Sequence, residues 1–567
     1  MEISASQALQ MYKDKEGELS KLRTRQKKDA ALAKRTKFVL TGDDNKPIPK
    51  CYNVTLPKAA NFASRANAIL ASANERMVCE GVGLDDNNTS KKETFFNYCL
   101  SVLAQQSAPR KIGNIFAFTA GQANLRGSIA RRVTVEYDEE KGLKVEILPW
   151  DTLFANWDFD SDGLYYAANT SIRSRALLES EYEKVKVSGK TGKIIDFLGK
   201  DINHIFIDGA HKLSLPNPRG YVPVAVAYTS AGLPFLDEDM DENLGESIFW
   251  QGRDLYDEAN RIASVAMTLH VGSLFPPVQK PYDEIPNEKP ESPYGGTSTV
   301  VPYKVEDGAY TAFPRQDLYQ ATRFIWSLID AHIQQSSFST IEFGTLQFPL
   351  SSVALRQLEE GRELVLLPSI QAISEAERQT CEMIKEQFIA LGKTVELQGE
   401  GKKASYAPKD LEGEYEIFFR YFTGSRKYAA AGISEAQALK PLELVSDDYL
   451  RNECIRVENP SEEARKLETQ RLERTNPAIQ IYNQLKGLVE QERWAEAWIQ
   501  RKLLRDTVRS LLSVPSQESP DNNGASAEGI PLFTGAPSKV GGRQPGGITA
   551  EETKKAAAIQ EMSGEEA

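Results

Sequence analysis

The sequence predicts an α+β fold that is mainly helical. Apolar residues recur at helical spacing through residues 245–272, 316–335 and 352–393. Between residues 129 and 230, β-branched and aromatic residues gather in short runs separated by proline and glycine, which is typical of strands. The chain has 567 residues, enough for several domains or one large elongated subunit.

Composition limits the function classes. The formal net charge of −12 argues against a protein whose main task is tight, non-specific binding to duplex DNA, because such binding requires neutralised phosphates. The negative charge is compatible with a protein that lines a passage for DNA, because a negative surface repels phosphate and does not hold it. The five cysteines are odd in number and form no CxxC pair, so we expect reduced thiols in a cytosolic setting. The start of the chain is unlike a signal peptide, and no apolar run approaches the ~20 residues that span a bilayer.

Helices are predicted first along the chain, over residues 1–40, 58–80 and 89–107. In the last of these, the core is expected to include Phe95 and Phe96. The β-rich block follows. Segments 129–137 and 143–148 flank the turn DEEKG and predict a hairpin, with a further strand near 164–168, a short helix at ALLESEYEKV and strands in HIFIDGAHKLSLPNP and GYVPVAVAYTS.

Residues 245–393 carry the most informative order. The helical run GESIFWQGRDLYDEANRIASVAMTLHVG leads into an excursion, Leu274 to Arg315, that contains eight prolines; the chain returns through the helical run QDLYQATRFIWSLIDAHIQQ. Proline has a fixed φ and no N–H, so the excursion is expected on a surface or in an interface. The pattern fits an ordinary helical hairpin with a long loop, or a protrusion whose apolar stripes neighbouring copies bury.

The third helical run contains Pro368, which predicts either one kinked helix or two helices that meet there. Strands are then expected in TVELQGE and GEYEIFFRYF, and helices from residue 433 to residue 512 with a break at Asn476–Pro477. From Pro515 onward the chain is rich in Gly, Pro, Ser and Asn, which predicts a disordered tail.

This order of elements resembles the portal proteins of tailed bacteriophages, in which a clip joins two stem helices and a tunnel loop leads into a long kinked helix. The resemblance covers residues 60–515, is most specific over 245–393 and includes no invariant motif. It implies an α+β portal fold with a mixed α/β wing, helical stem, extended clip, long kinked helix and helical crown. The expected parts are an N-terminal helical arm 1–57, wing 58–243, stem helices 244–273 and 316–336, clip 274–315, tunnel loop 337–351, kinked helix 352–393, wing return strands 394–433, crown 434–515 and disordered tail 516–567.

The resemblance also implies a function and partners. A ring of twelve identical subunits would sit at one capsid vertex of the virion, after assembly in the host cytoplasm, and double-stranded DNA would pass through its channel without sequence-specific contacts. The expected partners are the terminase large subunit, the major capsid protein and scaffold, and the head–tail adaptor, with no membrane. In that family terminase supplies the packaging energy, which agrees with the missing nucleotide-binding motif here, and since no catalytic motif is found either, neither a cofactor nor catalysis is expected. The alternative in the same class is another oligomeric virion or scaffold component.

Two charged stretches have competing interpretations. Residues 21–37 hold eight basic residues and one acid, which indicates a solvated face or a peripheral contact with DNA, capsid or scaffold. Residues 237–258 hold nine acids and one base. The first of these acids suit a solvated loop and a helix N-terminus. Asp254, Asp257 and Glu258 lie deeper in the predicted helix, and in a ring they could form charged bands or pair with a neighbour's basic residues.

The segment SSFSTIEFGTLQFPL, residues 336–350, mixes polar and apolar residues. It fits either a channel constriction or a turn at Gly344 packed on its own subunit. On the channel interpretation, Glu342 would repel phosphate. The candidate channel residues are Ser339, Thr340, Glu342 and Gln347, and the candidate clip contacts with the adaptor are Tyr282, Tyr294 and Tyr303.

Motifs for catalysis or metal binding are sparse. Asp158, Asp160 and Asp162 alternate as in a calcium loop, but Asn169 stands where a bidentate glutamate is expected, and a turn favoured by Asp and Gly explains the same residues. VSGKTGK lacks the earlier glycine of a phosphate-binding loop. No histidine has ligand spacing, and no nucleophile motif is present. The alternative to a structural protein is a hydrolase with a helical lid that uses the three aspartates as metal ligands.

Overall fold

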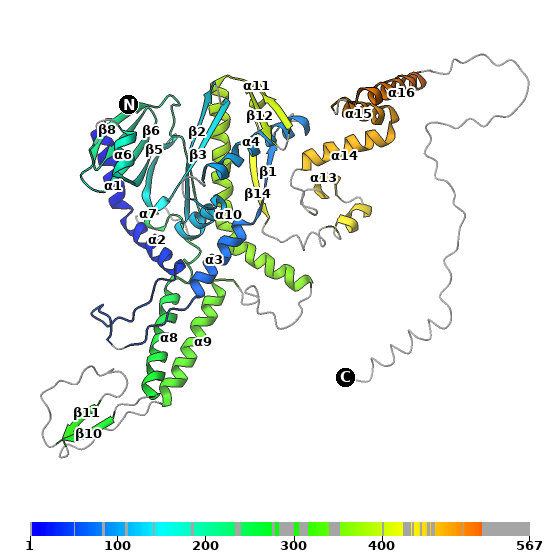
Figure 1. Cartoon of the computed structure of the whole chain (residues 1–567). Coiled ribbons are helices and arrows are strands. Elements are labelled where there is room, and N and C mark those ends of the chain that lie inside the picture. Colours follow the sequence, from blue (N-terminus) through cyan, green and yellow to red (C-terminus); the bar gives the residue numbers. More distant parts are fainter. Residues whose placement is uncertain are drawn as a thin grey trace, which may run out of the picture. The chain divides into compact units, whose positions relative to one another are not determined.

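A computed structural model gives the fold, and Figure 1 labels its helices and strands. The chain divides into two compact units, Met1–Leu472 and Glu473–Ala567. Helices and antiparallel sheets both build the first unit, so the predicted α+β class is confirmed. The described residues are 3–49, 51–81, 86–107, 112–139, 142–182, 186–232, 240–274, 278–282, 300–304, 316–338, 352–399, 402–422, 433, 436–442, 445–450, 454, 460–490 and 493–512.

The predicted N-terminal helix is two helices, α1 (Ala5–Glu18) and α2 (Ser20–Ala33). The side chain of Ser4 caps α1 by accepting a hydrogen bond from the Gln7 amide. Beyond Ala33 the helical prediction is wrong, because Arg35 adopts a φ of +54° and the chain turns away. Residues 34–49 and 51–57, here named the strap, contain no helix and lead to α3 (Lys58–Ala71).

The helix predicted over 58–80 is wrong in its second half, where residues form strand β1 (Asn74–Glu80). This strand pairs antiparallel with β14 (Glu416–Phe422), and its side chains Met77 and Cys79 enter the core. The partner lies more than 300 residues away along the chain, so no local pattern reveals the pairing. The following helix α4 (Asp86–Ser107) confirms the next prediction and buries Phe95 and Phe96.

Two antiparallel sheets follow. The predicted hairpin is confirmed as β2 (Ser128–Asp138) and β3 (Gly142–Trp150), and β9 (Val224–Tyr228) completes a sheet of order β3–β2–β9. The second sheet has five strands where the sequence predicts three, because β4 and β6 were missed. Its members are β4 (Ala155–Asp160), β5 (Gly163–Ser174), β6 (Thr191–Gly199), β7 (Ile202–Ile207) and β8 (Ala210–Pro216), with the predicted short helix α6 (Arg175–Glu181) between β5 and β6.

Short segments connect these sheets to their neighbours. Before β2, helix α5 (Ile115–Gly121) continues into a π-helical turn, η2 (Gln122–Arg126), and η3 (Thr152–Phe154) precedes β4. After β9, a short helix, α7 (Met240–Asn243), precedes the stem. Tyr12 on α1 packs against aromatic residues of the five-stranded sheet, so the N-terminal arm covers one of its faces.

The stem consists of α8 (Arg253–Leu274) and α9 (Gln316–Gln335), which lie side by side (Figure 1). They are antiparallel, since Gly252 at the start of α8 touches Ser336 at the end of α9. The predicted bounds of α9 are confirmed, whereas α8 starts later than residue 245 because 248–252 form turns. Within the excursion, β10 (Val278–Tyr282) and β11 (Val300–Lys304) form a parallel pair.

The long helix α10 (Ser352–Leu391) is one helix with Pro368 inside it, and Figure 1 shows that it changes direction once along its length. This outcome agrees with the kinked-helix interpretation, since proline removes one helical hydrogen bond. The helix contacts β2, β9 and β14, and its Ile384 and Phe388 are buried in a core that includes residues of β2 and β14. The return strands are β12 (Val395–Gly399), β13 (Lys402–Tyr406) and β14, with α11 (Pro408–Leu411) before the last.

Helices dominate the described residues toward the C-terminus. The predicted break at Asn476–Pro477 is confirmed, because α14 (Pro460–Thr475) ends there and α15 (Pro477–Glu490) begins. In the second unit, α15 packs against α16 (Trp494–Leu512). Two short helical turns precede them, η7 (Lys440–Leu442) and α13 (Asp447–Tyr449). The tail predicted for 516–567 lies outside the described residues.

Candidate functional site

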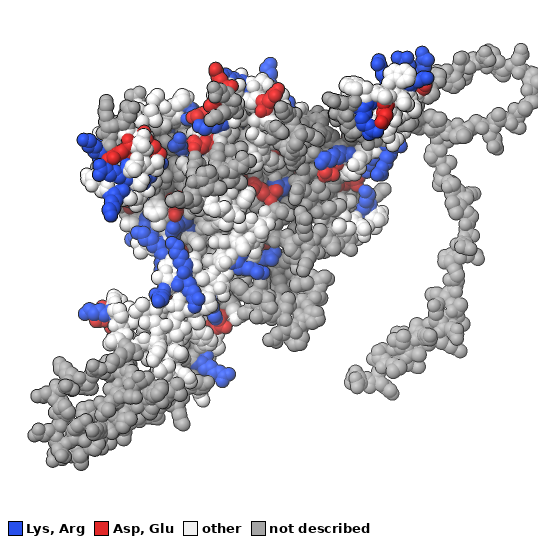
Figure 2. Space-filling model, viewed as in Figure 1, with Lys and Arg blue, Asp and Glu red and all other residues white. Residues whose placement is uncertain are grey.

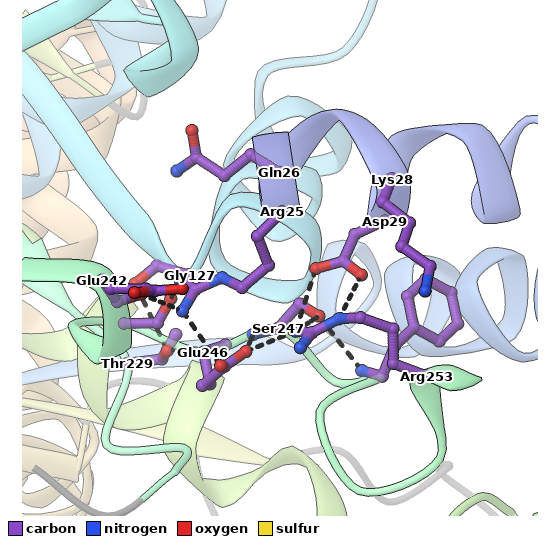
Figure 3. Close-up of polar contacts among 12 residues, drawn as sticks. Arg25, Gln26, Lys28, Asp29, Gly127, Thr229, Glu242, Glu246, Ser247 and Arg253 are labelled. Carbon is purple, nitrogen blue, oxygen red and sulfur yellow. Dashed lines mark hydrogen bonds and ion pairs between the residues drawn. The ribbon is translucent and has the colours of Figure 1, made fainter. Parts of the chain in front are cut away.

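A dense set of ion pairs joins α2 to the segment that enters the stem helix α8, and we name this contact the junction (Figure 3). The acids of this segment face the basic residues of α2. The pairs are Lys21–Glu242 at 2.9 Å, Arg25–Glu246 at 2.9 Å, Lys28–Asp254 at 2.7 Å and Lys28–Asp257 at 3.6 Å. Of these three cations, only Arg25 is largely buried against the chain's own acids, whereas Lys21 and Lys28 stay partly exposed, as expected for a solvated face.

The acids of α8 also have partners within their own chain. Asp254 and Asp257 bind Lys28 of their own chain, and Glu258 lies 3.4 Å from Arg261. Since α8 begins at Arg253, Asp254 also lies in the first helical turn, where a carboxylate complements the helix dipole. No neighbouring subunit is needed to balance these charges. Residues 237–239 of the acidic stretch lie outside the described residues.

Arg253 is the centre of the junction. Its Nε and Nη2 donate to the two carboxylate oxygens of Asp29 at 2.7 and 3.2 Å, and Nη2 also contacts Glu246. Asp29 is only 1% exposed. Burial lowers the pKa of Arg253, but hydrogen bonds to Asp29 and Glu246 outweigh that effect and raise it. The guanidinium is therefore a permanent cation that fixes the base of α8 to α2.

Two glycines bring backbones together beside these ion pairs. Gly127 and Gly245 have φ of +74° and +64°, and a Cβ on either would overlap the carbonyl oxygen of the other. The amide of Thr229 donates to the carbonyl oxygen of Gly127 at 2.9 Å, and its hydroxyl donates to that of Glu246 at 2.7 Å. The end of the π-helical turn η2 is thus locked to the entry of the stem.

Replacing Asp29 with asparagine is expected to lower the free energy of unfolding by about 3 kcal/mol, because Arg253 then loses a buried anionic partner. The matched control is Lys28→Ala in the same helix. Its ion pair with Asp254 is exposed, so the expected loss is below about 1 kcal/mol. Urea unfolding followed by tryptophan fluorescence measures both. Equal losses in the two variants would show that the junction is not the anchor described here.

The stem helices carry apolar side chains that their own subunit leaves in water. On α9, Phe324, Ile325 and Leu328 are 68%, 44% and 48% exposed. On α8, Val265 and Met267 are 38% and 44% exposed. These five residues, which we name the stem face, are exposed apolar side chains on two adjacent helices.

The structure places only part of the predicted channel and clip. Ser339, Thr340, Glu342 and Gln347, the candidate channel residues, lie outside the described residues, as does Tyr294 in the clip. Tyr282 lies on β10 opposite Lys304, and Tyr303 lies on β11 opposite Pro281. The expected extended segments are therefore present in the clip, paired with each other. Their pairing with a neighbouring subunit stays a prediction.

The three candidate metal ligands lie in and beside the turn between β4 and β5. Asp160 pairs with Lys200 at 2.6 Å and accepts a hydrogen bond from the Asp162 amide at 2.9 Å, while Asp158 lies 3.8 Å from Lys15. This arrangement is the Asp-rich turn that the sequence allowed. In the described part of the chain, no group of three or more His, Cys, Asp or Glu side chains is placed to hold a metal ion.

The structure contains a buried charged cluster that the sequence did not predict. Arg131 on β2 is 1% exposed, and its Nη1 lies 2.6 Å from Glu377 Oε1 on α10 while Nη2 donates to Thr119. Glu75 on β1 lies opposite Tyr421 on β14 at the same place. Burial, and then repulsion by Glu377, raise the pKa of Glu75 to about 8, although Arg131 opposes them. The sequence analysis missed this cluster because it predicted the residues of β1, which include Glu75, as helix.

Comparison with known proteins gives the chain no family: no protein-family model matches it, and no curated protein matches it.

All five cysteines are free of disulfide bonds. Among the described helices, none combines the length and apolarity that crossing a bilayer requires.

Proposed function

We propose that this chain is the ring-forming subunit of a phage portal, a structural protein at one capsid vertex through whose channel DNA is packaged and ejected. The observation that carries the proposal is the stem: two antiparallel helices, joined by a proline-rich excursion with its own strand pair, that expose apolar side chains. Such helices have little core of their own. A closed ring of identical subunits would bury the stem face of each copy against the next.

Two further features support the proposal. The junction fixes the base of the stem to the body through buried ion pairs, which suits an element that must hold its direction within a ring. The 40-residue α10 with its internal proline matches the long kinked helix that the portal resemblance implies. In this proposal the ring holds twelve copies, catalyses no reaction, binds terminase and later the head–tail adaptor, and contacts the capsid protein and scaffold.

The stem face gives a direct test by oligomeric state. The unaltered protein is expected to elute as a ring of near-megadalton mass in light scattering and to show rings with a central hole by negative stain. Phe324→Asp should leave subunits folded but unable to assemble, because a carboxylate would be buried without a partner. Phe159→Asp is the matched control, since Phe159 is 52% exposed on β4, away from the stem. A monomeric unaltered protein, or rings from Phe324→Asp, would contradict the proposal.

A further inference from the structure

The strap lies against α8 in a regular ladder. Amides of alternate strap residues donate to side chains one helical turn apart on α8. The bonds are Tyr52 to Thr268 at 3.0 Å, Val54 to Ser264 at 2.9 Å and Leu56 to Asn260 at 2.8 Å. Two extended residues advance ~6.6 Å and four helical residues ~6 Å, so the two repeats stay in step. These hydrogen bonds hold residues 52–56 of the strap along α8.

A pocket lies between this strap, the end of α2 and the start of α8. It encloses about 330 Å³, at the lower end of the ~300–1,000 Å³ that is usual for ligand pockets. Leu32, Val39, Leu56 and Tyr256 give it apolar walls. A second, more open hollow along the strap shares Arg35, Lys37, Phe38, Val39 and Thr55 with it. The two together form one groove.

The groove is positive in a chain of net charge −12. Its pocket is lined by four cations, Lys28, Arg35, Lys37 and Lys58, against one carboxylate, that of Asp257. Asp254 and Asp257 bind Lys28, and Asp330 binds Lys58, whereas Lys37 is exposed and forms no ion pair with the described residues. Figure 2 shows Lys and Arg side chains gathered over α2, which borders the groove.

We infer that this groove binds an acidic peptide segment of a partner protein, with one bulky apolar side chain seated in the pocket and flanking carboxylates beside Arg35 and Lys37. The apolar walls require an apolar anchor, and the cations at the rim require anions next to it. The open continuation along the strap suits an extended chain. Nucleic acid fits less well, because phosphate and sugar would leave the apolar walls unfilled. The inference concerns one subunit and does not depend on ring formation.

Fluorescence anisotropy with the full-length protein and a labelled probe, acetyl-Glu-Asp-Phe-Glu-Asp, tests the inference. Lys37→Glu is expected to weaken binding about tenfold, because an attractive charge becomes repulsive. Val39→Asp should weaken it at least as much, since Val39 is 44% exposed on the pocket wall. Lys46→Glu is the matched control, because it makes the same charge change on the strap at a residue that does not line the pocket. This variant is expected to keep its affinity for the probe within about twofold of the unaltered protein.

Probe chemistry separates the possible ligands. Replacing the probe's phenylalanine with alanine should weaken binding about tenfold, and a probe with lysine and arginine for the acids should not bind. Tighter binding of a single-stranded oligothymidylate than of the acidic probe would overturn the inference in favour of nucleic acid. Equal affinities of the Lys37→Glu and Lys46→Glu variants, both with unchanged thermal melting, would also overturn it. Light scattering of the same samples measures ring formation separately from peptide binding. A failure of the portal proposal can therefore be told apart from a failure of the peptide-binding inference.

Discussion

Gly245→Ala is expected to lower the free energy of unfolding by about 4 kcal/mol or more, the largest single-residue effect at the junction. Alanine would have to hold a φ of +64° while its Cβ overlapped the carbonyl oxygen of Gly127. Both partners are backbone, and the carbonyl of Gly127 is already fixed by the Thr229 amide. No side-chain rotation can therefore relieve the overlap. Urea unfolding and soluble yield measure the result.

The control for that variant is Gly209→Ala in the turn between β7 and β8. Gly209 has a φ of +79°, but nothing lies within 4 Å of the Cβ it would gain. It therefore reports the backbone conformation alone, at a cost of about 1 kcal/mol. The difference between the two variants isolates the overlap at the junction. Similar losses in both would show that the backbones at Gly127 and Gly245 can separate cheaply.

Segments whose amphipathic pattern is complete within one element were predicted well from the sequence. Helix α9 has the predicted bounds, the hairpin β2–β3 has the predicted turn, and the helices on either side of Asn476–Pro477 break as expected. In each case the deciding information is local: apolar spacing, a turn sequence or a proline. Strand β1 is the counterexample, since β14 stabilises it from more than 300 residues away.

The junction shows why a site is harder to predict than an element. The basic stretch and the acidic stretch were both visible in the sequence, but nothing local says that α2 lies against the segment entering α8. Pairs such as Lys21–Glu242 join residues 221 positions apart. The close approach of Gly127 and Gly245 could not be predicted for the same reason, because each glycine taken alone looks like an ordinary turn residue. Such contacts depend on tertiary packing, which a single sequence does not encode in any short window.

Arg131→Met should be the second large effect, with a loss of about 3–5 kcal/mol near pH 8. Arg131 is the cation between Glu377, with which it pairs at 2.6 Å, and Glu75. Methionine would leave two carboxylates in the core without it. The loss should shrink toward pH 4, because Glu75 then carries a proton in the folded protein and no longer adds a second negative charge beside Glu377.

The pH dependence of the unaltered protein follows from Glu75, whose pKa rises from an ordinary 4.5 to about 8 on folding, chiefly through burial. Between these values the folded protein holds a proton that the unfolded chain has released, so stability falls as pH rises through the window. Glu75→Gln should remove this fall and stabilise the protein at pH 8 by roughly 2–4 kcal/mol, with little change at pH 4. It should also restore part of the loss in Arg131→Met. Glu80→Gln, an exposed site on the same strand, is the control, and an equal pH slope in both glutamine variants would rule out Glu75 as the titrating group.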